Sequence, residues 1–150
     1  MRRMAHKGFT LVEILIVVVI LGILAAIVIP QFANASNDAL KGTLQTQLQT
    51  ISSQVELYRV RNVGNYPANI TTAANNNGWA ELIDEGYLKE EPRNGYTGST
   101  LLVDGVEADA IAQTSASANG WYFDLSSGTL TVGQVWAAGY DADANTLEHE

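Results

Sequence analysis

The first third of the chain is dominated by one long run of apolar residues. From Ile14 to Ile29 every side chain is apolar, and Gly22 in the middle of the run has none. Taken over residues 9–32, the stretch would be about 36 Å long as a helix, which is enough to cross the apolar layer of a membrane. A helix that is apolar on every face is buried in lipid or in other protein. The pattern therefore predicts a transmembrane helix over residues 9–32.

A second pattern follows, in which apolar residues recur every three or four positions over residues 33–63. Gln and Ser occupy the opposite face without alternating charges, which disfavours an independent coiled coil and favours packing on a sheet of the same chain. Gly64 and Pro67 end the pattern. We expect one continuous helix from Phe9 to about Arg61, bent at Pro30. The apolar stripe consists of Leu40, Leu44, Leu48, Ile51, Val55 and Tyr58.

Residues 64–150 have the short segments and frequent turn residues of a small globular head. A helix is expected at residues 79–83, with Gly86 at its C-terminal end. The second and third of four candidate strands are joined by a hairpin signal at Ser126–Gly128. The predicted fold class is α+β, with a long N-terminal helix packed on a small antiparallel sheet. The candidate strands are residues 100–103, 121–125, 129–132 and 134–138.

Charge is distributed unevenly along the chain, whose formal net charge is −8. Arg2, Arg3 and Lys7 precede the apolar run, and the remaining five basic residues face sixteen acidic ones. Such an acidic body argues against nucleic-acid binding. The positive-inside rule places the N-terminus in the cytoplasm and the head beyond the inner membrane. The chain has no cysteine, so it can form neither a disulfide nor a Cys-ligated metal site.

Glu13 is the residue that a plain membrane anchor does not explain. A carboxylate inside a membrane segment is costly and normally has a partner and a purpose. A cut after Gly8 would create an amino group on Phe9, four residues before Glu13, which could pair with this carboxylate in the same chain or in a neighbouring one. A cleaved secretory signal peptide and an uncleaved anchor are the alternatives, but neither accounts for the acidic residue.

Residues 7–13, Lys-Gly-Phe-Thr-Leu-Val-Glu, together with the apolar run that follows, resemble the class III signal of type IV pilins and type II secretion pseudopilins. The resemblance implies that residues 1–8 are a leader that a prepilin peptidase removes between Gly8 and Phe9. It also implies N-methylation of Phe9 and a role for Glu13 in assembly.

The same resemblance extends to the helix and to the partners of the chain. It implies that Gly22 and Pro30 border a stretch that can unwind when subunits pack in a filament. The implied partners are other copies of the chain, the prepilin peptidase, an inner-membrane assembly platform, and minor pilins or pseudopilins.

Asp141, Asp143 and Asn145 place oxygen-bearing side chains at alternate positions near the C-terminus. This spacing is typical of the first part of a calcium-binding loop, but the match is partial because Thr146 stands where an EF-hand needs Gly. Major pseudopilins, which this chain resembles in lacking cysteines, hold calcium near the C-terminus. The resemblance therefore implies calcium as a cofactor.

We find no catalytic motif, and His6 and the histidine at position 149 lie at the ends of the chain, so no enzymatic activity is expected. The expected function is that of a structural subunit of a type II secretion pseudopilus. One alternative is a type IV pilus subunit for adhesion, motility or DNA uptake. Another is a membrane-anchored binding module that works as a monomer and would tolerate Glu13→Leu.

Overall fold

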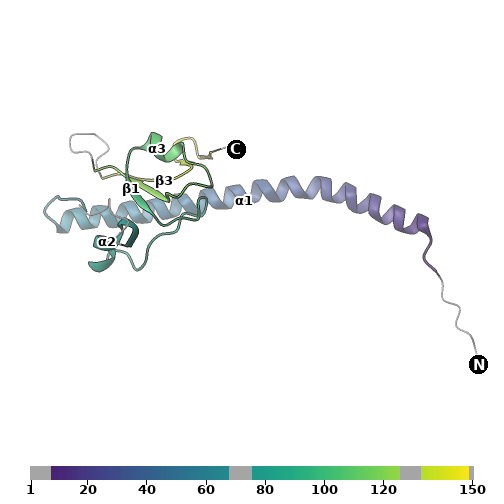
Figure 1. Cartoon of the computed structure of the whole chain (residues 1–150), viewed down its shortest axis with the longest axis horizontal. Helices are drawn as coiled ribbons and strands as arrows, with labels where there is room; N and C mark the ends of the chain where they lie inside the picture. Colours follow the sequence, from purple (N-terminus) through teal and green to yellow (C-terminus); the bar gives the residue numbers. More distant parts are fainter. Residues whose placement is uncertain (1–7, 68–75, 126–132, 149–150) are drawn as a thin grey trace, which may run out of the picture. The chain divides into compact units, whose positions relative to one another are not determined.

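One long helix runs through both compact units of the molecule. The computed structural model describes residues 8–67, 76–125 and 133–148. The chain divides into Met1–Asn37 and Asp38–Glu150, and helix α1 (Leu11–Arg61) passes from the first unit into the second (Figure 1). The predicted continuous helix is therefore confirmed. It remains helical on both sides of Pro30, so the unwinding expected in a filament stays a prediction.

The second part of α1 contributes four buried side chains to the core of the head. Leu44, Ile51, Val55 and Tyr58 of the predicted stripe are buried, and the other two stripe residues, both leucines, are half-buried against them. Helical spacing places all six on one face, which confirms the amphipathic helix.

Helix α2 (Ala80–Asp84) forms where a helix was expected, after a short 3₁₀ turn, η1 (Asn76–Gly78). Gly86 follows it with a φ of 79°, the left-handed conformation that glycine adopts without a steric penalty. The amides of the next two residues then donate to the carbonyl of Leu82 at 2.8 and 3.0 Å. In Figure 1, α2 lies on one side of the second part of α1, whereas α3 and the strands lie on the other.

The head contains a three-stranded sheet of order β1-β2-β3, with strands β1 (Leu102–Asp104), β2 (Trp121–Phe123) and β3 (Val135–Ala137). Strands β2 and β3 are antiparallel as predicted, but β1 and β2 are parallel, so the expectation of a wholly antiparallel sheet is wrong. The physical reason is the crossover between β1 and β2, which carries α3 (Glu107–Ile111) and returns the chain in the same direction. The predicted strand 129–132 and its hairpin signal lie outside the described residues.

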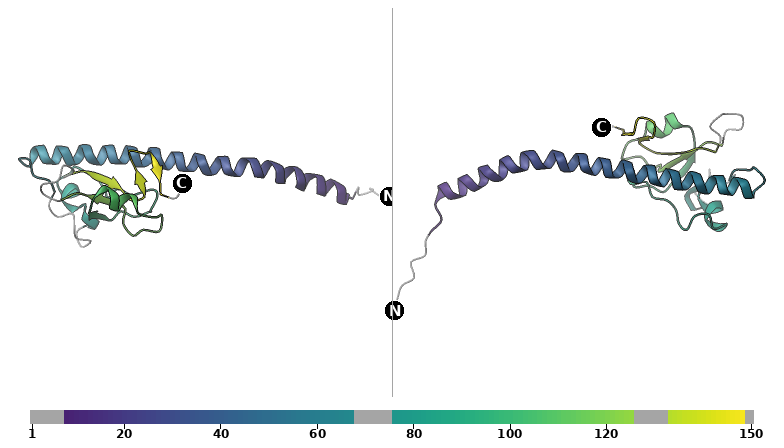
Figure 2. Two further views of the ribbon diagram at one scale, coloured as in Figure 1. Left: turned by 90° about the horizontal axis from the view of Figure 1, so that it is seen from above. Right: turned by 180° about the vertical axis from the view of Figure 1, so that it is seen from behind.

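The sheet separates two apolar clusters because successive side chains of a strand point to opposite faces. Trp121 and Phe123 of β2 pack into the main core with α1, whereas Tyr122 between them packs beside Ala110 of α3. Seen from above in Figure 2, the strands lie along one side of α1. The α+β fold with a long helix and a small sheet is thus confirmed.

One buried polar side chain joins three separate segments of the head. Asn94 is fully buried and donates from Nδ2 to the carbonyls of Gly120 and Ala138, at 2.7 and 3.0 Å. Its Oδ1 accepts from the amides of Tyr96 and Thr97, at 2.7 and 3.1 Å. All four bonds of this amide group are satisfied, as a buried polar group requires.

Two short strands, β4 (Tyr140–Asp141) and β5 (Thr146–Leu147), form an antiparallel hairpin near the C-terminus. This hairpin was not predicted, because the spacing of Asp141, Asp143 and Asn145 was interpreted as the start of a calcium loop. The turn is completed by Asn145 in the left-handed conformation, with a φ of 54°. Asparagine is one of the few residues other than glycine that adopts this conformation readily.

Candidate functional site

The start of α1 is built around a reciprocal pair of side chains. The amide and the hydroxyl of Thr10 both donate to Glu13 Oε2 at 3.0 Å. In return, the amide of Glu13 donates to Thr10 Oγ1 at 3.2 Å. This arrangement is a capping box, in which residues three positions apart satisfy each other's unpaired groups at a helix N-terminus. This cap was not predicted, although the Thr-x-x-Glu spacing at residues 10–13 is a sequence signal for it.

The cap gives Glu13 a defined position before any partner is present. Two donors already face one carboxylate oxygen, and the N-terminal end of a helix favours negative charge. The amide of Thr10 is one of these donors, and Phe9 is the residue immediately before it. An amino group created on Phe9 would therefore appear next to a carboxylate that is already held in place.

The peptide bond between Gly8 and Phe9 lies before the first turn of α1, which begins at Leu11. Both residues are exposed, Phe9 by 77%. A peptidase needs an extended and accessible segment, and residues 8–10 are not in regular secondary structure. The geometry is compatible with the predicted cleavage, which stays a prediction.

Within residues 8–37, the described part of its unit, no other segment covers the apolar half of α1. Exposure of its large apolar side chains ranges from 42% at Val28 to 81% at Leu11. By length and composition, α1 is able to cross a membrane. A continuous apolar surface of this extent marks a membrane or protein interaction site.

Gly22 lies within this apolar surface and has no structural task in the single subunit. A methyl group added at this position would meet nothing within 4 Å. The absence of a side chain leaves room for the backbone of another helix to approach closely. The implied role of Gly22 in flexibility stays a prediction.

Two of the three expected calcium ligands accept hydrogen bonds within the β4–β5 hairpin. Asp141 Oδ1 accepts from the amides of Asp143 and Ala144, both at 2.9 Å, and Asn145 Oδ1 accepts from the hydroxyl of Tyr140 at 3.0 Å. Across residues 8–67, 76–125 and 133–148, no three His, Cys, Asp or Glu side chains come together as metal ligands. These contacts do not test the expected site, and calcium binding stays a prediction.

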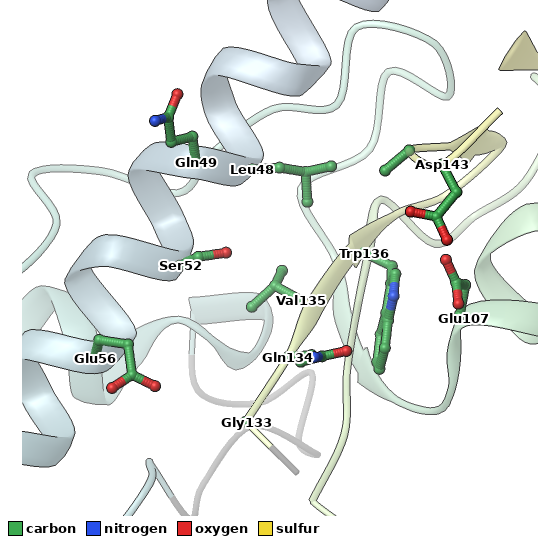
Figure 3. A pocket seen from close by; sticks show the side chains of 11 residues that line it. Leu48, Gln49, Ser52, Glu56, Glu107, Gly133, Gln134, Val135, Trp136 and Asp143 are labelled. Atoms are coloured by element: carbon green, nitrogen blue, oxygen red, sulfur yellow. The ribbon is translucent and has the colours of Figure 1, made fainter. Parts of the chain in front are cut away.

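A groove of about 540 Å³ lies between α1, α3, β3 and the β4–β5 hairpin. Figure 3 shows the carboxylates of Asp143 and Glu107 pointing toward each other over Trp136, with Glu56 on the opposite wall. None of the described residues that line it is Lys, Arg or His. The groove thus adds a concentrated negative charge to an already acidic head.

Taken together, the fold and the start of α1 define a class of protein with one exposed apolar helix, a capped carboxylate at its beginning and a small α+β head. Residues 3–29 match the family model described as the prokaryotic N-terminal methylation motif. No solved structure is significantly similar to the chain.

Curated relatives extend the match beyond the first helix. The chain is 33% identical over 99 residues to the type II secretion system core protein G of Pseudomonas aeruginosa, an alignment that covers 61% of this chain and 69% of that protein. Identity to the core protein G of Klebsiella michiganensis is 30% over 110 residues, covering 69% and 77%. Identity to the type IV major pilin protein PilE1 of Neisseria gonorrhoeae is 35% over 102 residues, covering 67% and 61%. The chain belongs to the family of type IV pilins and type II secretion pseudopilins.

Proposed function

We propose that the chain is the major structural subunit of a type II secretion pseudopilus, a filament that supports protein secretion. A pilin-like filament subunit agrees with its family, and several relatives are named as core protein G of that secretion system. The observation that carries the proposal is the exposed apolar part of α1, which begins with the Thr10–Glu13 cap. In this proposal the activity of the chain is assembly and not catalysis.

Assembly begins with removal of residues 1–8 by a prepilin peptidase. The new amino group on Phe9 then becomes N-methylated and provides the cation that Glu13 lacks. Within one subunit, or between two neighbours, this pair would neutralise a charge that lipid or a packed helix bundle penalises. A wrong register between subunits would leave this carboxylate unpaired and would be penalised, so the pair selects one register.

The apolar side chains by themselves give little specificity. In a membrane they are already surrounded by hydrocarbon, so moving them into a helix bundle gains packing contacts and not the hydrophobic effect. Close approach at Gly22 and pairing at Glu13 are the two features of α1 that can select one arrangement of helices. Specific assembly is therefore the reason why an otherwise apolar helix carries these two exceptions.

Location and partners follow from the same proposal. The subunit is inserted once in the inner membrane with its N-terminus in the cytoplasm, as the basic residues before the apolar run indicate. The head lies on the far side of that membrane. An assembly platform in the inner membrane and minor pseudopilins are the further partners that we infer.

The experiment that tests the proposal is an intact mass of the protein purified from membranes or sheared filaments of its host. A chain that begins at Phe9 and carries one additional methyl group would support processing and assembly. A chain that retains residues 1–8 would indicate an ordinary anchor. A chain that begins after Ala25 would indicate a secreted soluble protein, and either result would contradict the proposal.

A second candidate is a type IV pilus, because the gonococcal major pilin is also a relative. Deletion of the coding sequence distinguishes the two. Loss of proteins from the culture medium would support the pseudopilus, whereas loss of surface pili and motility with unchanged secretion would support the pilus. A monomeric anchored module predicts that Glu13→Leu leaves function intact, and a filament subunit predicts that this variant fails to assemble.

A further inference from the structure

The last turn of α1 ends in a conformation that its residue does not favour. After Arg61 the chain turns through Val63, which has a φ of 57°, and Gly64, which has a φ of 89°. The amide of Gly64 donates to the carbonyl of Arg59 at 2.8 Å and closes the helix end. The left-handed position before this amide is usually taken by glycine or asparagine. A β-branched residue is strained there, so local conformation does not explain Val63.

Packing within the head does not explain Val63 either. Its side chain is 93% exposed, and the neighbouring Val60 and Leu57 are exposed by 74% and 41%. We call these three residues the apolar tip. Among the described residues of the head, one other large apolar side chain, Val106, is as exposed as Leu57, at 41%. A strained and fully exposed valine on an acidic head suggests a contact with another molecule.

A matching depression lies elsewhere on the same head. It has a volume of about 150 Å³ and lies between α1 and the segment after α2. The hydroxyls of Thr46 and Thr50 donate to carbonyls of their own helix at 2.8 and 2.9 Å, so these groups need no outside partner. No charged side chain lines the depression, which consists of Thr46, Gln47, Thr50, Ile51, Leu88 and Pro92.

Gln47 adds an unsatisfied polar atom to this apolar depression. Its Nε2 donates to the carbonyl of Arg93 at 3.2 Å, but its buried Oε1 has no donor in the described parts of the chain. A buried acceptor without a donor is unfavourable, and nearly all such groups in folded proteins are satisfied. The exposed Asn65, which follows Gly64, carries an amide group that can donate, whereas the amide of Asn62 already donates to Glu85 Oε2 at 3.4 Å. An incoming apolar tip would therefore bring both an apolar side chain and a donor.

We propose that Val63 of one subunit inserts into the depression beside Gln47 of a second copy of the chain. This inference rests on the proposed filament function. It adds an interface between the heads of neighbouring subunits to that filament. Val63 and the depression lie at different positions along α1. At a rise of 1.5 Å per residue, they are roughly 20 Å apart along the helix axis. A contact between different patches of identical subunits does not close into a pair, and it continues into an open series. The contact therefore favours a filament over a dimer.

Cysteine cross-linking tests the contact directly, because the natural chain contains no cysteine. The full-length double variant Val63→Cys with Thr50→Cys is assembled in its host, sheared and mildly oxidised. We expect a ladder of disulfide-linked dimers, trimers and larger species, because each subunit presents both partners. Each single variant should remain monomeric, and the matched pair Val106→Cys with Thr50→Cys should give no ladder.

The outcomes of the cross-linking distinguish this inference from the proposed function. Filaments that form normally without a ladder from the double variant would overturn the contact and leave the filament function in place. Dimers from Val63→Cys alone would show that two tips meet each other, which also overturns it. A wild-type chain that forms no filaments would overturn both.

A second variant separates the contact from the stability of the head. Val63→Gly removes the strain at the left-handed position, so the detergent-solubilised subunit should melt at the same or a higher temperature. Filament yield should nevertheless fall about tenfold, the effect of losing one buried apolar side chain from an interface. Val106→Ala, as the control, should leave the yield unchanged. If Val63→Gly assembled as well as the wild type, the inserted valine would be refuted.

Discussion

Asn94 offers the sharpest test of how the head is held together. In Asn94→Leu the side chain keeps a similar volume but loses four hydrogen bonds of 2.7 to 3.1 Å. The carbonyl of Gly120 still accepts from the amide of Ala138 at 3.0 Å, so it keeps a partner. The carbonyl of Ala138 and the amides of residues 96 and 97 lose the partner that Asn94 supplied.

The expected cost follows from these three groups. One buried group left unsatisfied costs about 1–3 kcal/mol, and the two half-buried amides can partly recover bonds to water. We therefore expect a loss of about 3 kcal/mol in the free energy of unfolding, which lowers the melting temperature of a head of this size by about 10 °C. Tryptophan fluorescence reports it well, because Trp79, Trp121 and Trp136 all lie in the packed head.

Asn94→Asp adds a pH signature to the same test. An aspartate keeps the oxygen that accepts from the two amides, but its second oxygen faces two carbonyl oxygens that it cannot bond when ionised. The protonated form is therefore favoured, and the pKa of this aspartate is raised in the folded state. A raised pKa means that stability is greatest at low pH and is lost as the pH rises above the unfolded value near 3.9. The exposed Asn65→Leu is the control and should change stability by less than about 0.5 kcal/mol. If Asn94→Leu melted within about 3 °C of the wild type, the role given to this side chain would be refuted.

Three further predictions concern other parts of the molecule. Thr10→Val should reduce filament yield while Thr10→Ser preserves it, because only serine retains both side-chain hydrogen bonds of the cap. Filament yield is measured in sheared fractions, and equal yields from the two variants would contradict the role of the cap. Burial and the hydrogen bond to Glu81 raise the pKa of Tyr58, so the stability from its neutral hydroxyl is present below the unfolded value of about 10 and is lost as the pH rises beyond it. Unfolding measured from pH 8 to 11.5 should therefore show a steeper alkaline loss for the wild type than for Tyr58→Phe, and parallel curves would oppose this assignment. Asp141→Ala should lower stability by about 1 kcal/mol even in EDTA, since its carboxylate accepts from two amides of the hairpin. A loss seen only in calcium would contradict this structural role and would support the predicted calcium site.

The parts of the fold that were predicted correctly are those with long periodic patterns. The buried stripe from Leu44 to Tyr58 covers four turns of α1, so its spacing identified both the helix and its buried face. Helix α2 was found through Trp79 and Gly86, an apolar start and a C-terminal glycine.

Some of the features that were not predicted belong to elements too short to show a periodic pattern. Others depend on contacts between distant parts of the chain. Helix α3 has five residues, and strands β4 and β5 have two each, less than the pattern of either structure requires. The parallel pairing of β1 with β2 follows from the route of the crossover and not from the composition of either strand.

The two ends of α1 differ in how far their conformation could be predicted from the sequence. The Thr10–Glu13 cap could have been found from residue types alone, because the capping box has a sequence signature. The left-handed conformation of Val63 could not, since valine is among the least expected residues at that position.

The connections made by Asn94 also determine when the head can fold. Its amide joins backbone groups at positions 120 and 138, and Leu147 completes the main core, so stable packing needs almost the whole chain at once. Such long-range contacts form late, after the residues that make them have all emerged from synthesis. A subunit inserted by its first helix would thus keep its head unfolded during passage across the membrane. The head would close only when the last residues arrive, because the contacts that stabilise it join positions near its beginning and its end.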